Sequence, residues 1–408
     1  MFVRNPATAL AVIVIALLAV AAGLSGCAAV IVRSPVPAAA LSQVTLPGLA
    51  HVRFWGDEVP KDVAATLRQR MPSLGKPPQA QQFENGQPVV NYLALSGGGS
   101  YGAFGAGLLV GWTRSGTRPS FEFVTGISAG ALIAPFAYLG PAYDRQLEEI
   151  WTQYGDDDLV NKQPLSILFG ASAALDTQPL ADLIAKYIDR KFLAAVAHEY
   201  RKGRVLLIGT TNIDAQRPVV WNMGEIALSS NPHALQLFRD VLLASASIPG
   251  AMPPVKIDVD AGGQGFDEFH VDGGVTRQIF LTPVALRLTD FDQFYPTPPL
   301  RRVYVIRNGR LSPRYKPVEA GAASLAATSI SALLDNHAAG DIYRIFVAAT
   351  RDGAEFRLAA DSSKLEPSGG ALFDKEYMKK LFAEARDQAS RGYPWLRTVP
   401  EVQQHSAR

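Results

Sequence analysis

The stretch Leu95-Ser96-Gly97-Gly98-Gly99-Ser100-Tyr101-Gly102 is the most informative part of this sequence. Residues 89–96 are largely apolar, as in a buried β-strand, and residues 101–112 are small and apolar, as in a buried helix. A glycine-rich turn between a strand and a helix directs backbone N–H groups toward one point at the helix N-terminus. The stretch therefore predicts a site for negative charge within an α/β fold.

The same stretch matches GxGxxG, the glycine pattern of dinucleotide-binding folds. That interpretation requires an acidic residue near the end of the next strand, about 20 residues further on. The next predicted strand, Phe121–Thr125, has Glu122 at its beginning and no acid at its end. A dinucleotide-binding oxidoreductase is therefore the least favoured function for this chain.

A second motif stands where that acid is missing. Gly126-Ile127-Ser128-Ala129-Gly130 follows the predicted strand and precedes an apolar helix that extends to about Leu139. The pattern GxSxG holds a serine on a sharp strand-to-helix turn, where its hydroxyl is exposed and small neighbours permit a tight backbone. A chance turn has the same five letters, but the flanking strand and helix favour a nucleophile elbow.

A serine hydroxyl needs a base before it can act as a nucleophile. None of the six histidines lies in a catalytic pattern, although His270 stands two residues before Asp272 and could share a strand face with it. Asp272-Gly273-Gly274 ends that predicted strand, and its glycines permit close approach to another turn. An ordinary Asp-Gly turn is the competing interpretation.

Together these three elements resemble the motifs of the patatin-like phospholipase family: a GGGxxG loop, a GxSxG elbow and a distant Asp-Gly-Gly. Ser128 follows Gly102 by 26 residues and precedes Asp272 by 144. Ala244–Pro249, which reads ASASIP, resembles the family's ASxxxP block. The resemblance covers residues 90–290, and its motifs are specific as an ordered set rather than singly.

The resemblance implies a lipid acyl hydrolase of the phospholipase A type that uses neither a cofactor nor a metal. Ser128 would attack an acyl ester of a membrane lipid or lysolipid, and Asp272 would accept its proton without help from a histidine. The oxyanion donors would be Gly98, Gly99 and Ala129, and the other motif residues are Gly97, Gly102, Gly126, Gly130, Gly273 and Gly274. Family members often carry Lys or Arg at the position of Tyr101, so this residue leaves the preferred lipid open.

The order of predicted elements indicates an α/β fold with a mostly parallel central sheet flanked by helices. We expect a signal peptide over residues 1–26, a proline-rich extension over 27–88, a patatin-like domain over 89–290 and a C-terminal α+β region over 291–408. The last region completes the core or is accessory to it. In it we predict a strand at Arg302–Asn308, a helix near Ala322–His337, a strand pair near Tyr343–Leu358 and a helix near Lys375–Gln388.

The N-terminus resembles a bacterial lipoprotein signal. The aliphatic run Ala9–Leu24 follows a single basic residue, Arg4, and ends in Leu-Ser-Gly before Cys27. In that class of protein the cysteine is acylated and becomes the mature N-terminus, and Ala28 after it favours the outer membrane of the bacterial envelope. An uncleaved membrane anchor and a plain cleaved signal are the alternatives.

The composition of the chain argues against several other classes of function. The 408 residues carry a formal net charge of +2, which gives no electrostatic case for nucleic-acid binding. With Cys27 as the one cysteine, the chain has no internal disulfide and no cysteine-rich zinc site. The run Asp156–Asp158 and the pair Asp258 and Asp260 are interpreted as solvated loops rather than metal sites, because hard cations need six or more converging oxygens.

Two further functions stay open beside the serine–aspartate hydrolase. One is a triad on the α/β-hydrolase fold, with Asp272 and His337 as partners of Ser128, although the closeness of the two glycine motifs argues against it. The other is a catalytically inactive lipid-binding lipoprotein on the same fold, against which the intact Ser128 and Asp272 argue.

Overall fold

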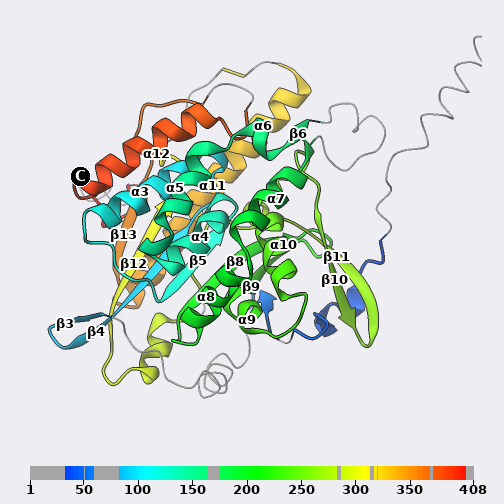
Figure 1. The fold of residues 1–408 in the computed structure, drawn as a ribbon, viewed down its shortest axis with the longest axis horizontal. Coiled ribbons are helices and arrows are strands. Elements are labelled where there is room, and N and C mark those ends of the chain that lie inside the picture. The colour runs from blue at the N-terminus through cyan, green and yellow to red at the C-terminus, as the bar shows by residue number, and fades with distance from the viewer. Residues whose placement is uncertain are drawn as a thin grey trace, which may run out of the picture.

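The computed structural model describes residues 33–49, 51–58, 82–162, 175–282, 286–312, 317–318, 320–367 and 371–400. These residues form one mixed β-sheet with helices on both faces, and a small two-stranded sheet beside it (Figure 1). The predicted α/β fold class is confirmed. The proposed signal peptide and Cys27 lie outside the described residues.

Five parallel strands form the centre of the sheet, so their carboxyl ends lie at one edge. Their order across the sheet is β8 (Val205–Asn212), β5 (Phe123–Ile127), β4 (Gln87–Leu95), β12 (Leu300–Arg307) and β13 (Glu355–Ala360). The two strands from the C-terminal region thus pair directly beside β4 and continue the same sheet. This edge carries both glycine motifs.

Antiparallel strands extend the sheet. They are β1 (Val44–Thr45), β2 (Arg53–Trp55), β3 (Gln82–Glu84), β9 (Arg217–Asn222), β10 (Val255–Ala261) and β11 (Gln264–Asp272). Of these, β3 pairs with β4, and the others lie around β8. The described part of the N-terminal extension supplies β1 to β3, and Arg33 at its start is hydrogen-bonded to Asp214 and Asp267. This part of the extension therefore wraps against the sheet. The separate pair is β6 (Asn161–Lys162) and β7 (Leu175–Asp176).

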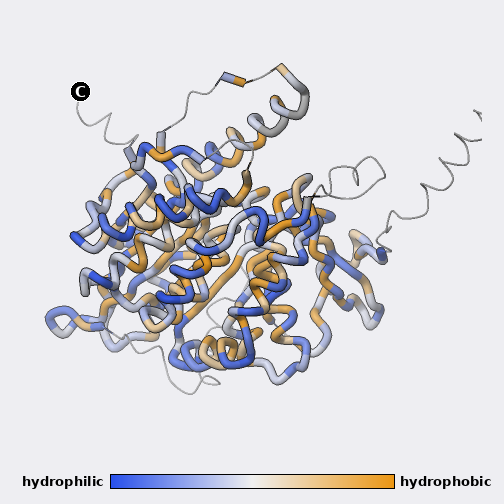
Figure 2. The backbone as a smooth tube through the Cα atoms, turned by 45° about the horizontal axis from the view of Figure 1, so that its top comes forward, coloured by the Kyte–Doolittle hydropathy of each residue, from blue (hydrophilic) through white to orange (hydrophobic). Residues whose placement is uncertain are grey.

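Alternate side chains of the central strands enter two different apolar layers. Leu93 and Leu95 of β4 belong to the larger core, together with α3 (Gly102–Arg114), α4 (Ala129–Leu139) and α12 (Lys375–Ser390). Tyr92 and Ala94 pack on the other face with residues of α11 (Ala322–Arg351). Figure 2 shows the central strands as mainly apolar, whereas the outer helices alternate between polar and apolar residues.

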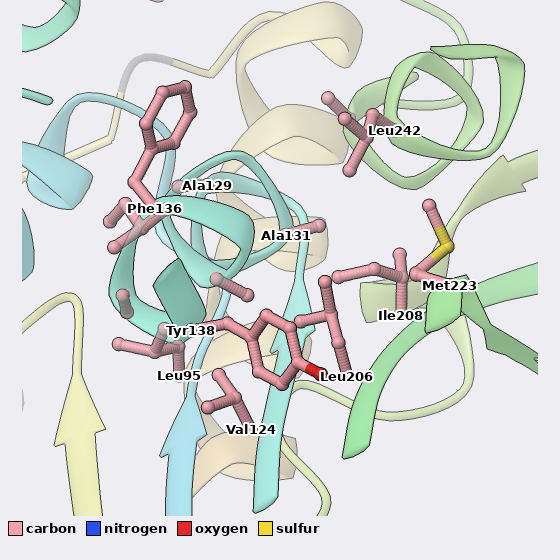
Figure 3. Packing of buried hydrophobic residues seen from close by; sticks show 14 of the residues in the cluster. Leu95, Val124, Ala129, Ala131, Phe136, Tyr138, Leu206, Ile208, Met223 and Leu242 are labelled. Atoms are coloured by element: carbon pink, nitrogen blue, oxygen red, sulfur yellow. The ribbon is translucent and has the colours of Figure 1, made fainter. Parts of the chain in front are cut away.

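The larger core positions the start of α4 over the sheet. Figure 3 shows Ala129, Ala131 and Tyr138 on this helix and Leu95, Val124 and Ile208 on the three strands below it. All of these side chains are at most 3% exposed, so α4 is held by close packing along its first turns. The other helices are α5 (Asp144–Gln153), α6 (Asp156–Leu159), α7 (Gln178–Tyr187), α8 (Arg190–Tyr200), α9 (Met223–Leu228) and α10 (Ala234–Ala246).

Three secondary-structure predictions were wrong. Tyr343 does not begin a strand, because α11 continues to Arg351 and only Glu355–Ala360 is extended. Asp258 and Asp260 lie in β10 rather than in a loop, and the whole acidic run Asp156–Asp158 lies in α6. Among the described residues, no helix is both long enough and apolar enough to cross a membrane.

Candidate active site

Ser128 occupies the sharp turn between β5 and α4. Its backbone has φ 53° and ψ −123°, a conformation that side-chain-bearing residues rarely adopt. Its N–H donates to Ser245 Oγ at 3.0 Å, and Ser245 Oγ in turn donates to the Gly209 carbonyl of β8 at 2.7 Å. The strained turn is therefore fixed to the neighbouring strand, and the Ser128 side chain remains 8% exposed.

The glycines around Ser128 allow the elbow to lie directly on the sheet. A Cβ on Gly126 would lie 2.4 Å from the Gly130 carbonyl oxygen, and a Cβ on Gly130 would lie 2.4 Å from the Leu95 carbonyl oxygen. Both contacts are with backbone atoms, which have little room to move. The two motif glycines thus bring the serine turn against the end of β4, where the glycine-rich loop begins.

Asp272 meets Ser128 because two strands end head-to-head along one edge of β8. Ile127, the last residue of β5, pairs with Gly209, and Asp272, the last residue of β11, pairs with the next residue, Thr210. The opposite edge of β8 is occupied by β9, so both strand ends must share the remaining edge. This register explains how residues 144 positions apart come together.

The Asp272 carboxylate is buried and hydrogen-bonded to the Ser128 hydroxyl. It also accepts the Gly274 N–H at 2.7 Å. Burial raises the pKa of Asp272 to about 6, because it disfavours the charged carboxylate more than these two hydrogen bonds favour it. Near neutral pH the carboxylate is therefore both ionised and more basic than an ordinary aspartate.

The glycine-rich loop lies beside the same serine. A Cβ on Gly97 would lie 3.2 Å from Ser128 Cβ, and Gly98 and Gly99 have φ values of 158° and 53°. In the described part of the chain, no turn or loop hydrogen bond uses the N–H of Gly98 or Gly99. These N–H groups are thus available to a ligand held next to Ser128.

Residues from distant strands support this loop. Asn308, after β12, donates from its backbone N–H to Ser96 Oγ at 2.8 Å and from its side chain to the Ser96 carbonyl at 2.7 Å. Its Oδ1 accepts the Gly105 N–H of α3 at 3.1 Å. The Gly97 N–H donates to the Gln278 carbonyl at 3.0 Å, which ties the loop to the segment after Asp272.

Sequence reasoning missed Asn308, Gln278 and the role of Ser245. Ser245 lies within the ASASIP block, whose resemblance to a family motif was the available signal. Asn308 and Gln278 follow no motif; their importance depends on β12 pairing with β4 and on the course of the chain after Asp272. Local sequence patterns do not carry such pairings.

The remaining candidate residues have other roles. Gly102 makes room for the Trp151 ring, to which a Cβ would approach within 2.1 Å, and Tyr101 stacks edge-on with Tyr377 at 5.6 Å between ring centroids. His337 is exposed on α11, and His270 is buried with its ring nitrogens 2.9 Å from Thr210 Oγ1 and 3.1 Å from Glu268. Neither histidine is among the described hydrogen-bond partners of Ser128 or Asp272.

The described residues contain no cluster of three or more His, Cys, Asp or Glu that could hold a metal ion.

Gly273 and Gly274 allow the loop after Asp272 to lie close to its neighbours. A Cβ on Gly273 would lie 2.5 Å from the Gly209 carbonyl oxygen, and a Cβ on Gly274 would lie 2.4 Å from Gln278 Nε2. The loop after Asp272 is therefore seated against both β8 and the segment that holds Gly97.

One of the three comparisons with known proteins covers the residues of this site. A family model described as patatin-like phospholipase matches residues 93–285, which include the glycine loop, the serine turn and Asp272. No curated protein matches the chain in sequence. Among solved structures, VipD from Legionella pneumophila matches with 12% identity and a TM-score of 0.34, over 78% of this chain and 70% of that chain. Residues 93–285 thus match a patatin-like phospholipase domain, and members of that family are typically lipid acyl hydrolases.

Proposed function

We propose that this protein is a serine acyl-ester hydrolase that releases fatty acids from membrane lipids through a Ser128–Asp272 dyad. One observation carries the proposal: the hydroxyl of a serine on a strained elbow is hydrogen-bonded to a buried carboxylate whose pKa is raised to about 6. A base with a pKa near the working pH combines ionisation with proton affinity. The adjacent N–H groups of the glycine loop add the donors that an acyl-transfer site needs.

In the first half-reaction the Ser128 Oγ attacks the ester carbonyl carbon while its proton moves to the Asp272 carboxylate. The carbonyl oxygen becomes an oxyanion, which the N–H groups of Gly98, Gly99 and Ala129 stabilise. The intermediate then collapses: the bond from the carbonyl carbon to the alcohol oxygen breaks, and the proton on Asp272 passes to that oxygen. The product is an acyl-serine and a free lysolipid or alcohol.

In the second half-reaction a water molecule attacks the acyl-serine. Asp272 takes a proton from that water, the oxyanion forms again at the same donors, and the bond from the carbonyl carbon to Ser128 Oγ breaks. The proton returns from Asp272 to the Ser128 oxygen, and a fatty acid leaves. Because the carboxylate is buried, bulk water does not compete for its hydrogen bond to Ser128.

We also propose that Cys27 is acylated and holds the protein at the bacterial outer membrane. Arg33 supports a short tether, because its guanidinium is hydrogen-bonded to Asp214 and Asp267 and stacks 3.6 Å from the Phe269 ring centroid. Arg33 follows Cys27 by only six positions, a distance of at most roughly 20 Å in a fully extended chain. An anchor at Cys27 would therefore keep the hydrolase close to its lipid substrate.

A fluorophosphonate probe tests the catalytic proposal. Wild-type protein is expected to take up one probe per chain, with the adduct on the peptide that contains Ser128, because the activated serine attacks the electrophilic phosphorus. The S128A variant is expected to show no adduct and no fatty-acid release from phospholipid vesicles, while S247A, which keeps the elbow intact, is expected to be labelled. Absence of labelling in the folded wild type would leave an inactive lipid-binding protein as the function.

Acylation at Cys27 is tested by the mass of the mature protein. The wild type, produced in a bacterium with its full N-terminus, is expected to begin at an acylated Cys27 and to fractionate with membranes. The C27S variant is expected to carry no acyl chain. A mature protein with an unmodified Cys27 thiol would contradict the anchor.

A further inference from the structure

The peptide group between Gly97 and Gly98 is held firmly from its carbonyl side. Ser96 Oγ donates to the Gly97 carbonyl oxygen at 2.7 Å, and Arg307 Nη1 donates to the same oxygen at 3.2 Å. The N–H of this peptide group belongs to Gly98. In a trans peptide the N–H points away from the carbonyl, so the two donors fix the direction in which the Gly98 N–H points.

Arg307 is a buried cation placed behind this loop. It is 4% exposed at the end of β12, while residues 96–102 carry no charged side chain. Its other terminal nitrogen donates to Asp335 Oδ1 at 2.7 Å, but the Asp335 side chain is 68% exposed on α11. Burial lowers the pKa of Arg307, yet a guanidinium remains charged at any physiological pH.

The position of the charge suits an oxyanion site. Water screens the exposed Asp335 carboxylate more than it screens the buried guanidinium, so positive potential dominates on the side of the loop. A cation that donates to a carbonyl oxygen also polarises the whole amide, which strengthens its N–H as a hydrogen-bond donor. Both effects favour negative charge at the Gly98 N–H.

We propose that Arg307 is a positioning residue of the oxyanion hole: from β12 it orients and polarises the Gly97–Gly98 peptide, so that the Gly98 N–H faces the developing oxyanion. This inference rests on the proposed function, because it assigns Arg307 a part in the same hydrolysis. The guanidinium does not touch the substrate; it acts through one peptide group.

The test compares R307M with the wild type on a soluble p-nitrophenyl ester. Methionine preserves much of the side-chain volume but has neither charge nor donor. Removing a direct oxyanion donor costs about 10²–10³ in kcat, so loss of the group that aligns the donor is expected to lower kcat about 10- to 100-fold. KM is expected to change less than threefold, because the ground-state ester carries no oxyanion.

Two matched variants separate this role from general support of the fold. R307K, which restores a cation, is expected to regain at least fivefold in kcat over R307M, and D335N, which keeps Arg307, is expected to stay within threefold of wild type. The acid limb of the pH profile is expected to stay at its wild-type pH in R307M. A shift of that limb by a full pH unit would mean that Arg307 acts on Asp272, and would overturn the inference.

If R307M does not fold, R307Q decides the question, since it retains an amide donor without charge. A loss in kcat of fivefold or more at unchanged KM supports the inference, and kcat within twofold of wild type overturns it. A wild type that the fluorophosphonate labels at Ser128, combined with unchanged kcat in folded R307M, would refute this inference alone. An unlabelled wild type would refute the proposed function and this inference together.

Discussion

Replacing Asp272 by asparagine is expected to lower kcat about 10³- to 10⁴-fold while making the folded protein more stable at alkaline pH. An amide cannot accept the Ser128 proton, so the contribution of general-base catalysis is lost. The side chain of asparagine has nearly the same shape and can still accept the Gly274 N–H. Esterase activity and urea unfolding of wild type and D272N, each at pH 4 and pH 8, measure both effects.

The sign of the stability effect follows from the raised pKa. In the unfolded chain Asp272 titrates near 3.8, and in the folded chain near 6, so the folded state holds the proton more tightly. The stabilisation that the protonated Asp272 contributes to the folded state is fully present below pH 4 and is lost as the pH rises through about 6. The two-unit difference corresponds to about 3 kcal/mol, which D272N is expected to recover in large part at pH 8 but not at pH 4.

The same pKa predicts the pH dependence of the wild type. The proposed mechanism requires the ionised Asp272 carboxylate, so kcat/KM is expected to fall about tenfold per pH unit below pH 6. D258N, which removes a largely exposed carboxylate on β10, is expected to leave activity, stability and pH profile unchanged. An acid limb below pH 4.5, or a D272N variant that retains a tenth of the wild-type kcat, would refute Asp272 as the base.

The sequence was sufficient to predict the local backbone structure around the candidate site. Gly97–Gly102 and Gly126–Gly130 lie where strand patterns end and helix patterns begin, and a buried serine turn needs glycines on either side for steric reasons. The motifs therefore carry their own physical explanation. The predicted strands at residues 89–96 and 302–308 correspond closely to β4 and β12 because each is rich in apolar and β-branched residues.

The sequence was not sufficient where the secondary structure of a segment depends on its strand partners or on its packing against the sheet. Ile342, Ile345 and Ala349 follow a helical spacing and pack in the same apolar layer as Tyr92 and Ala94. The β-branched and aromatic residues of the surrounding stretch, however, favour a strand. In β10, Val255–Ala261 alternates strictly between apolar and polar residues, as a half-buried strand does, although aspartate by itself is more typical of loops.

The residues that support the glycine-rich loop reach it through pairing between strands that are far apart in the sequence. Arg307 and Asn308 follow the glycine loop by about 200 residues, and they reach Ser96 and Gly97 only because β12 runs parallel to β4 with Ile306 beside Leu95. Nothing in the local sequence around residue 307 indicates that partner. The same holds for the meeting of β5 and β11 on one edge of β8, which brings Ser128 to Asp272.

Adding one methyl group to Gly98 is expected to reduce kcat 10²- to 10³-fold, about the effect of losing an oxyanion donor. A Cβ at this position would lie 2.0 Å from the Asn308 carbonyl oxygen and 2.9 Å from Asn308 Cβ, so the loop must move away from β12. That movement breaks the alignment that Ser96 and Arg307 impose on the Gly97–Gly98 peptide. The Gly98 N–H then no longer faces the ester.

G99A is the matched control, because it separates the effect of backbone strain at a glycine from the effect of displacing the loop. A Cβ on Gly99 would lie 3.9 Å from its nearest neighbour, the Leu372 carbonyl oxygen, so it has room, but φ 53° is unfavourable for alanine by about 1 kcal/mol. G99A is therefore expected to lose little stability and less than tenfold in kcat. Steady-state kinetics and fluorophosphonate labelling rates of the two variants, with folding checked by circular dichroism, make the comparison. Equal losses in both would mean that glycine flexibility, rather than contact with Asn308, sets the geometry of the loop.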